Sequence, residues 1–204
     1  MKARERHLRR GRPREFDRAE ALRAALAVFR EQGYEGTTLA ELQSAMGGIS
    51  PPSLYAAFGS KEGLFKEAVA LYRETVSADI ARALVEGPTA RDAIRGMLRS
   101  SVAAFTKAGE PRGCLLVLGA INCTRAGDAH EHLRDVRRAA RQGLTRRLKQ
   151  GVEEGDVPAS VDVSALASFY TTVLFGISIQ ARDGASRDSL MATVDCAMSA
   201  WPAR

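Results

Sequence analysis

The chain has 204 residues, of which 45% are hydrophobic and 26% are charged, and its formal net charge is +6. This composition is typical of a soluble globular protein with one large domain or a small and a larger one. The N-terminal stretch MKARERHLRRGRPREF lacks the apolar core of a signal peptide. The longest apolar run, CLLVLGAIN (114–122), is too short to span a membrane. We therefore expect a cytoplasmic protein with no membrane partner.

The positive charge is concentrated at the N-terminus. Residues 1–18 contain eight Lys and Arg against three acidic residues, so five of the six net charges lie there. A basic segment beside a nearly neutral body predicts a polyanionic partner. A solvated tail without a partner is the alternative, and composition alone favours it.

The first two predicted helices cover residues 17–33 and 38–46. Each begins with a capping-box pattern, in which Asp17 is followed by Glu20 and Thr38 by Glu41. Glycines end both helices, at Gly33 and at the pair 47–48.

A short third helix is predicted between residues 50 and 59. Ser50 is suited to the N-cap, and two prolines occupy the first helical positions, where a missing N–H is tolerated. Leu54 and Phe58 lie four residues apart and define the inward face, and Gly59 ends the helix.

Helical periodicity continues to the C-terminus. A long helix is predicted from Ser60 to about Gly87, and it is followed by helical segments at 90–107, 113–126, 128–153, 162–182 and 187–201. The fold class is therefore all-α, with about nine helices. The arginine-rich stretch 134–149 is predicted to be a solvated face, with a patch that attracts an anionic effector as the alternative.

Residues 38–58 read as a helix, a tight turn and a short helix, which is the pattern of a helix-turn-helix. In that motif the second helix enters the major groove of DNA, so a short and sharply bounded helix suits it. The inward residues would hold the two helices at a fixed angle, and the outward residues would face the DNA.

Two motifs make residues 16–66 resemble the DNA-binding domain of the TetR/AcrR family of bacterial transcriptional repressors. They are AxxxFREQGYEGTTLAEL (25–42) and SLYAAFGSKEGLF (53–65). The resemblance implies a basic flexible arm (1–14), a helix-turn-helix domain (15–62) and a helical ligand-binding and dimerisation domain (63–204). It also implies a homodimer that represses transcription from a palindromic double-stranded DNA operator and is released by a small-molecule effector. Members commonly have one glycine before the apolar turn residue, whereas this chain has two, and the additional glycine is expected to loosen the turn and rotate the next helix slightly.

The resemblance also assigns roles to single residues. Tyr55 is expected to reach a phosphate or a base edge through its hydroxyl. Lys61 is expected to meet a phosphate, and Thr38 to contact another through its backbone N–H or its hydroxyl. Ser53, between Pro52 and the inward Leu54, is the expected base-facing residue of the short helix. The full predicted DNA-binding set is Arg12, Arg14, Thr38, Pro51, Pro52, Ser53, Tyr55 and Lys61. Because the short helix has no Arg, Asn or Gln for two-pronged base recognition, DNA shape and an arm in the minor groove are expected to contribute.

The body gives fewer signals. Phe105, Phe169 and Tyr170 are candidate ligand-binding residues, and the effector itself is not identified. Cys114, Cys123 and Cys196 match no metal or redox spacing, so we expect reduced, buried thiols, with thiol-based sensing as the alternative. No metal, cofactor or catalytic constellation is predicted.

Two other functions remain open from the sequence. One is a non-specific architectural DNA-binding protein, against which the long C-terminal body argues. The other is a helical enzyme or carrier with an incidental helix-turn-helix, against which the specific 53–65 motif argues.

Overall fold

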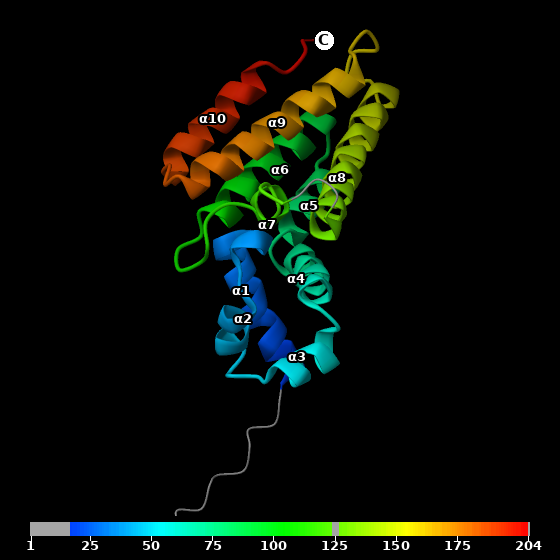
Figure 1. Cartoon of the computed structure of the whole chain (residues 1–204). Coiled ribbons are helices and arrows are strands. Elements are labelled where there is room, and N and C mark those ends of the chain that lie inside the picture. Colours follow the sequence, from blue (N-terminus) through cyan, green and yellow to red (C-terminus); the bar gives the residue numbers. More distant parts are fainter. Residues whose placement is uncertain (1–16, 124–126, 204) are drawn as a thin grey trace, which may run out of the picture.

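The computed structural model describes residues 17–123 and 127–203, and this part of the chain forms ten α-helices and no strand. The predicted all-α class is therefore confirmed. Three N-terminal helices gather at one end, and α4 leads from them into the larger helical body (Figure 1). The helices are α1 (Arg18–Gly36), α2 (Leu39–Ala45), α3 (Pro51–Phe58), α4 (Lys61–Thr75), α5 (Ala78–Glu86), α6 (Ala90–Phe105), α7 (Leu115–Leu118), α8 (Asp128–Glu153), α9 (Val163–Arg182) and α10 (Arg187–Ser199).

Side-chain caps fix where the N-terminal helices begin. Asp17 accepts hydrogen bonds from the amides of Ala19 and Glu20 at 2.9 and 3.0 Å. Thr38 and Glu41 form the reciprocal capping box. Ser60 accepts from the amide of Gly63 at 2.9 Å and so starts α4. These caps satisfy helix-terminal N–H groups that have no partner within the helix, which is why the sequence signals were reliable.

The backbone of α1 breaks at the predicted glycine. Gly33 has φ 72° and ψ 178°, and residues 34–36 form one further turn beyond it. The Tyr34 amide donates to the carbonyl of Gly119 at 2.7 Å, and a Cβ on Gly33 would lie 3.3 Å from that same oxygen. The end of α1 is thus bonded to the segment that follows α7, at the junction of the two units.

An aromatic cluster joins α1 to α4. Phe29 and Phe65 are fully buried, with ring centroids 5.0 Å apart in an edge-to-face arrangement. The Tyr34 ring lies 5.0 Å from Phe65 as well. Because aromatic side chains bury large apolar areas, this cluster fixes the position of α4 relative to α1.

The prediction of one long helix from residue 60 to residue 87 is wrong, because the helix is interrupted between α4 and α5. The amides of Val76 and Ser77 both donate to the carbonyl of Tyr72, at 2.9 and 3.0 Å, so the regular ladder stops there. Thr75 also donates its hydroxyl to the Leu71 carbonyl at 2.7 Å, a bond that bends helices.

The predicted helix at 113–126 is reduced to the single turn α7, and residues 124–126 lie outside the described part. Two tertiary bonds take carbonyls that a longer helix would use. Arg137 donates to the Leu116 carbonyl at 2.8 Å, and the Tyr34 amide donates to the Gly119 carbonyl at 2.7 Å. Tertiary hydrogen bonding therefore replaces the helical ladder in this segment.

Helix α9 is the one described helix that is long and apolar enough, by length and composition alone, to cross a membrane. The expectation that no segment reaches this length is therefore wrong by that measure. Of the most apolar stretch of 18 residues in α9, only 22% is buried within the protein. Phe169 and Ile179 are each 42% exposed, so α9 has an apolar face that its own chain leaves uncovered.

Candidate functional site

The turn between α2 and α3 is closed by two backbone hydrogen bonds. The amide of Gly47 donates to the Ser44 carbonyl at 3.2 Å, and that of Gly48 donates to the Gln43 carbonyl at 2.8 Å. Both glycines have positive φ, at 82° and 78°. This pairing is that of a Schellman motif, so both glycines take part in a hydrogen-bonded turn, while the looser turn and rotated helix relative to one-glycine relatives stay predictions.

We expect Gly48→Ala to lower the free energy of unfolding by about 1–2 kcal/mol. Apart from the two adjacent residues, no atom of the described residues lies within 4 Å of the added Cβ, so the loss comes from the left-handed backbone. Urea denaturation measures it. Gly143→Ala in α8 is the control. Gly143 has an ordinary helical φ, so this variant protein is expected to be more stable than the parent. A Gly48→Ala protein as stable as the parent would contradict the assigned turn geometry.

Helix α3 buries one face and exposes the other. Leu54 and Phe58 are 1% and 6% exposed and pack into the core. Tyr55 is 44% exposed, as predicted. The remaining exposed residues of the helix are Pro51, Pro52, Ser53 and Ala56. Because α3 contains no charged side chain, its outer surface offers hydroxyl groups and apolar contacts only.

The polar residues near this surface already have partners. Ser53 Oγ lies 2.8 Å from Ser50 Oγ, next to the cap of α3. The Thr38 amide and hydroxyl both donate to a Glu41 oxygen, at 2.8 and 2.7 Å. These two bonds lower the pKa of Glu41, with the backbone bond as the larger cause. A phosphate could therefore reach the Thr38 donors only by displacing an ionised carboxylate.

Lys61 lies at the first position of α4 and is half-buried. Its Nζ stands 4.3 Å from the centroid of the Tyr34 ring, so the cation rests on the end of α1. Arg12 and Arg14 lie outside the described residues.

Arg18 organises this unit, a role that the sequence did not indicate. Its guanidinium donates to both Glu67 oxygens, at 2.7 and 2.8 Å, and to the Ala57 carbonyl at 3.2 Å. It also lies 4.6 Å from the centroid of the Phe58 ring. Arg18 thus ties the start of α1 to α3 and α4. Its partner is 49 residues away, so no local pattern could have revealed the contact.

A cavity of about 680 Å³ lies in the body, among α4 to α9. Its volume falls within the range of small-molecule pockets. The predicted candidate Phe105 lines it, but Phe169 and Tyr170 do not. Phe169 is exposed, and the buried Tyr170 ring packs 5.7 Å from that of Trp201. Helical periodicity placed these two aromatic residues on α9 but gave no information about what covers each face.

The arginine-rich stretch 134–149 is not a uniformly solvated face. Arg147 is 7% exposed and donates to the Gly87 carbonyl at 3.2 Å and to Glu154 at 3.3 Å. Arg137 is half-buried and donates to the Leu116 carbonyl. Three arginines of this stretch, Arg137, Arg141 and Arg146, line the cavity.

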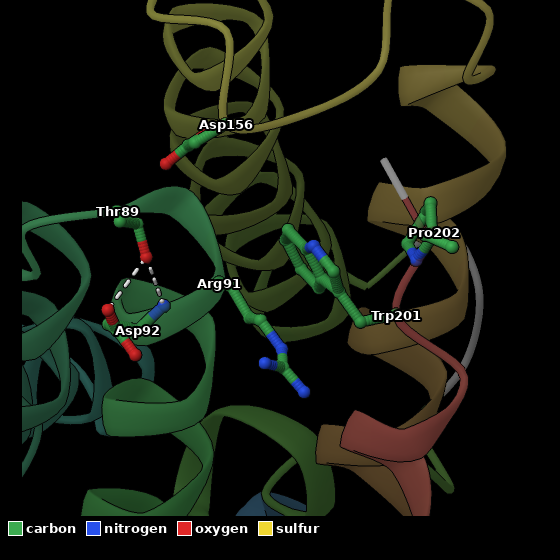
Figure 2. Close-up of a pocket in the computed structure, with 7 residues that line it drawn as sticks. Thr89, Arg91, Asp92, Asp156, Trp201 and Pro202 are labelled. Atoms are coloured by element: carbon green, nitrogen blue, oxygen red, sulfur yellow. Dashed lines mark hydrogen bonds between the residues drawn. The ribbon is translucent and has the colours of Figure 1, made fainter.

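A second hollow, of about 460 Å³, lies near the C-terminus and is polar (Figure 2). The Thr89 hydroxyl donates to the Asp92 carboxylate and accepts from the Asp92 amide, while Asp156 accepts from the Ala90 amide. Arg91 and Trp201 complete the rim. Thr89 and Asp156 thus both cap the start of α6, Thr89 from the adjacent turn and Asp156 from 66 residues away.

The thiols are only partly as predicted. Cys114 and Cys123 are buried, whereas Cys196 on α10 is exposed. Burial raises the pKa of the Cys114 thiol. The backbone amide of Cys114 donates to Ser178 Oγ at 2.9 Å. A buried thiol with a raised pKa is a poor nucleophile.

Comparison with known proteins adds to this geometry. A family profile described as "Bacterial regulatory proteins, tetR family" matches residues 21–68, and one described as "Tetracyclin repressor-like, C-terminal domain" matches residues 90–191. The HTH-type transcriptional repressor ComR of Escherichia coli K12 is 34% identical over 198 residues, covering 95% of this chain and 92% of that protein. The repressor BdcR of the same organism is 30% identical over 185 residues, covering 90% and 88%. A solved structure of a cysteine variant of the TetR family regulator CifR, with double-stranded operator DNA, is 46% identical and has a TM-score of 0.88, covering 94% of this chain and 100% of that one.

Proposed function

Because this chain belongs to the TetR family of bacterial regulatory proteins, we propose that it represses transcription as a homodimer on a palindromic operator and is released by a small molecule. The chain is a helix-turn-helix transcriptional regulator. Its relatives ComR and BdcR are transcriptional repressors, and its structural neighbour CifR is a regulator solved with operator DNA. It works in the cytoplasm, with residues 15–62 as the DNA-binding domain and residues 63–204 for effector binding and dimerisation.

The observation that carries this proposal is the exposed face of α3. A short, capped helix with a hydrogen-bonded turn before it can enter a major groove at a fixed angle. Tyr55 and Ser53 offer hydroxyl groups, and Pro51 and Pro52 can contact thymine methyl groups. Arg12 and Arg14 supply positive charge from the arm, and Lys61 meets phosphate once it leaves the Tyr34 ring.

A second copy of the chain is the proposed occupant of the uncovered face of α9. Phe169 and Ile179 on that face would be buried between copies, together with the outer side of α10. An isologous pair gives two copies of α3 related by a two-fold axis, which matches a palindromic operator.

Effector release would use the junction at α7. Cavity residues Leu116 and Val117 belong to α7, and Gly119 directly after it holds the Tyr34 amide of α1. Arg182 at the end of α9 also donates to the Glu31 carbonyl of α1. A ligand that displaces α7 would thus move α1 and the DNA-binding unit, and linkage requires operator and ligand to weaken each other equally.

We expect Tyr55→Phe to weaken operator binding about tenfold or more, because a hydrogen bond to a charged phosphate contributes about 1.5–3 kcal/mol. The operator would first be recovered by chromatin immunoprecipitation of the tagged protein. A duplex containing the recovered palindrome is then titrated by fluorescence anisotropy. Thermal unfolding without DNA should not change, since the Tyr55 side chain is exposed.

The matched control is Tyr34→Phe, which removes a hydroxyl outside α3 and keeps the ring beneath Lys61. If Tyr55→Phe melts earlier but binds normally, the recognition surface has been placed on the wrong face. A scrambled duplex that binds as tightly as the palindrome would instead favour the architectural alternative.

A further inference from the structure

The 680 Å³ cavity combines apolar walls with arginines that form no ion pair with any described residue. From this combination we infer that the effector is an amphipathic anion, with an apolar body along α5, α6 and α9 and a carboxylate head held by Arg137. This inference names the ligand class of the cavity and rests on the proposed function only for its regulatory meaning.

The walls are suited to an apolar body. Met97 and Phe105 of α6 form the buried floor, with 4% and 2% exposure. Ile80 and Leu84 of α5 and Phe175 of α9 are partly buried and line the sides. Helix α5 has no fully buried residue, although its apolar side chains face this cavity. A ligand would cover apolar surface that the chain itself leaves open, which favours binding.

Arg137 is suited to an anionic head. Its guanidinium carries five N–H donors, and a single hydrogen bond is formed with the described residues, to the Leu116 carbonyl at 2.8 Å. No described carboxylate forms an ion pair with it, in contrast to its neighbours Arg134 and Arg138, which pair with Asp135. Burial lowers the pKa of Arg137, but an arginine keeps its charge in a protein. The charge is therefore partly desolvated and uncompensated, a costly state that a bound carboxylate would relieve.

The charges around Arg137 have the same sign. Arg73, Arg141 and Arg146 also line the cavity, and none of them forms an ion pair within the described part of the chain. Among the described residues that line the cavity, Glu74 is the one acidic residue, against four arginines. This excess attracts anions and disfavours cationic ligands.

The test is calorimetric binding of straight-chain carboxylates with six to twelve carbons, with alcohols and primary amines of the same lengths for comparison. We expect the best carboxylate to bind about tenfold or more tightly than its alcohol, because the alcohol cannot make a charge-assisted bond to Arg137. The amine, which is protonated at neutral pH, should bind most weakly of the three.

Arg137→Gln locates the head group. Glutamine keeps an N–H donor for the Leu116 carbonyl but removes the charge, so carboxylate affinity should fall to that of the alcohol while alcohol affinity stays the same. Arg138→Gln removes the same charge one residue away, from an exposed side chain outside the cavity, and should leave both affinities unchanged. Thermal unfolding checks that both variants fold. If Arg137→Gln does not fold, the affinities of the wild-type protein for the three ligand series still decide the ligand class.

The inference is overturned if alcohols or amines bind as tightly as the carboxylates, if no carboxylate of the series binds, or if Arg137→Gln binds carboxylates normally. An operator titration without any added ligand tests the repressor function separately. If the protein binds its operator but no carboxylate, only the inferred ligand class is rejected. If it does not bind the operator, the proposed repressor function is rejected.

Discussion

Deletion of residues 1–13 should weaken operator binding about a hundredfold and reduce its salt dependence. The deletion removes six basic residues and one glutamate. Helices α2 and α3 together contain no Lys or Arg. Phosphate neutralisation must therefore come largely from outside these two helices. Each lost phosphate contact lowers the slope of log affinity against log salt by about 0.9, and a dimer would lose the contacts of two arms. Titrations of the operator duplex at several salt concentrations measure the slope.

The control for this deletion keeps the length of the arm and changes only its charge. A variant with the six basic residues of 1–13 replaced by glutamine should behave like the deletion. Thermal unfolding of both proteins should match the parent, because both variants keep Asp17, which caps the first described helix. A salt slope equal to that of the parent would refute the arm's role and leave the role of α3 intact.

Phe65→Ala should lower the free energy of unfolding by about 3–5 kcal/mol, the usual cost of truncating a buried phenylalanine. Phe65 is fully buried on α4, and its ring packs on those of Phe29 and Tyr34. The truncation leaves a cavity between α1 and α4, the two helices that carry α3. Operator affinity should fall as well, because α3 depends on that packing for its position.

Urea denaturation at one fixed protein concentration measures the change, since the stability of a dimer depends on concentration. Val85→Ala is the control, because Val85 is 78% exposed and its truncation should cost less than about 0.5 kcal/mol. A loss below about 1 kcal/mol for Phe65→Ala would mean that the α1–α4 cluster does not hold the DNA-binding unit together.

The sequence predicted the N-terminal unit well because its signals are local. Caps at Asp17, Thr38, Ser50 and Ser60 act within three residues of the helix that they begin. The exposure of Tyr55 followed from helical geometry once Leu54 and Phe58 defined the inward face of α3.

The errors arose where distant contacts override local preference. The shortness of α7 depends on bonds from Arg137 and Tyr34, which no pattern around residue 116 contains. Seven basic residues in 134–149 suggested a solvated face, yet Arg147 and Arg137 turn inward toward carbonyls of other segments. Of the three ligand-binding candidates on the apolar helices, Phe105 alone lines the cavity, because its walls come from helices far apart in the sequence.

The bond between the Tyr34 amide and the Gly119 carbonyl makes one backbone hydrogen a reporter on the junction. Its protection against exchange with deuterated solvent depends on α1 staying in contact with the segment after α7, since amide exchange reports local opening. The exchange rate at Tyr34 therefore measures how often the DNA-binding unit separates from the body. A ligand that loosens the junction would accelerate exchange at this position while amides deep in α6 keep their protection.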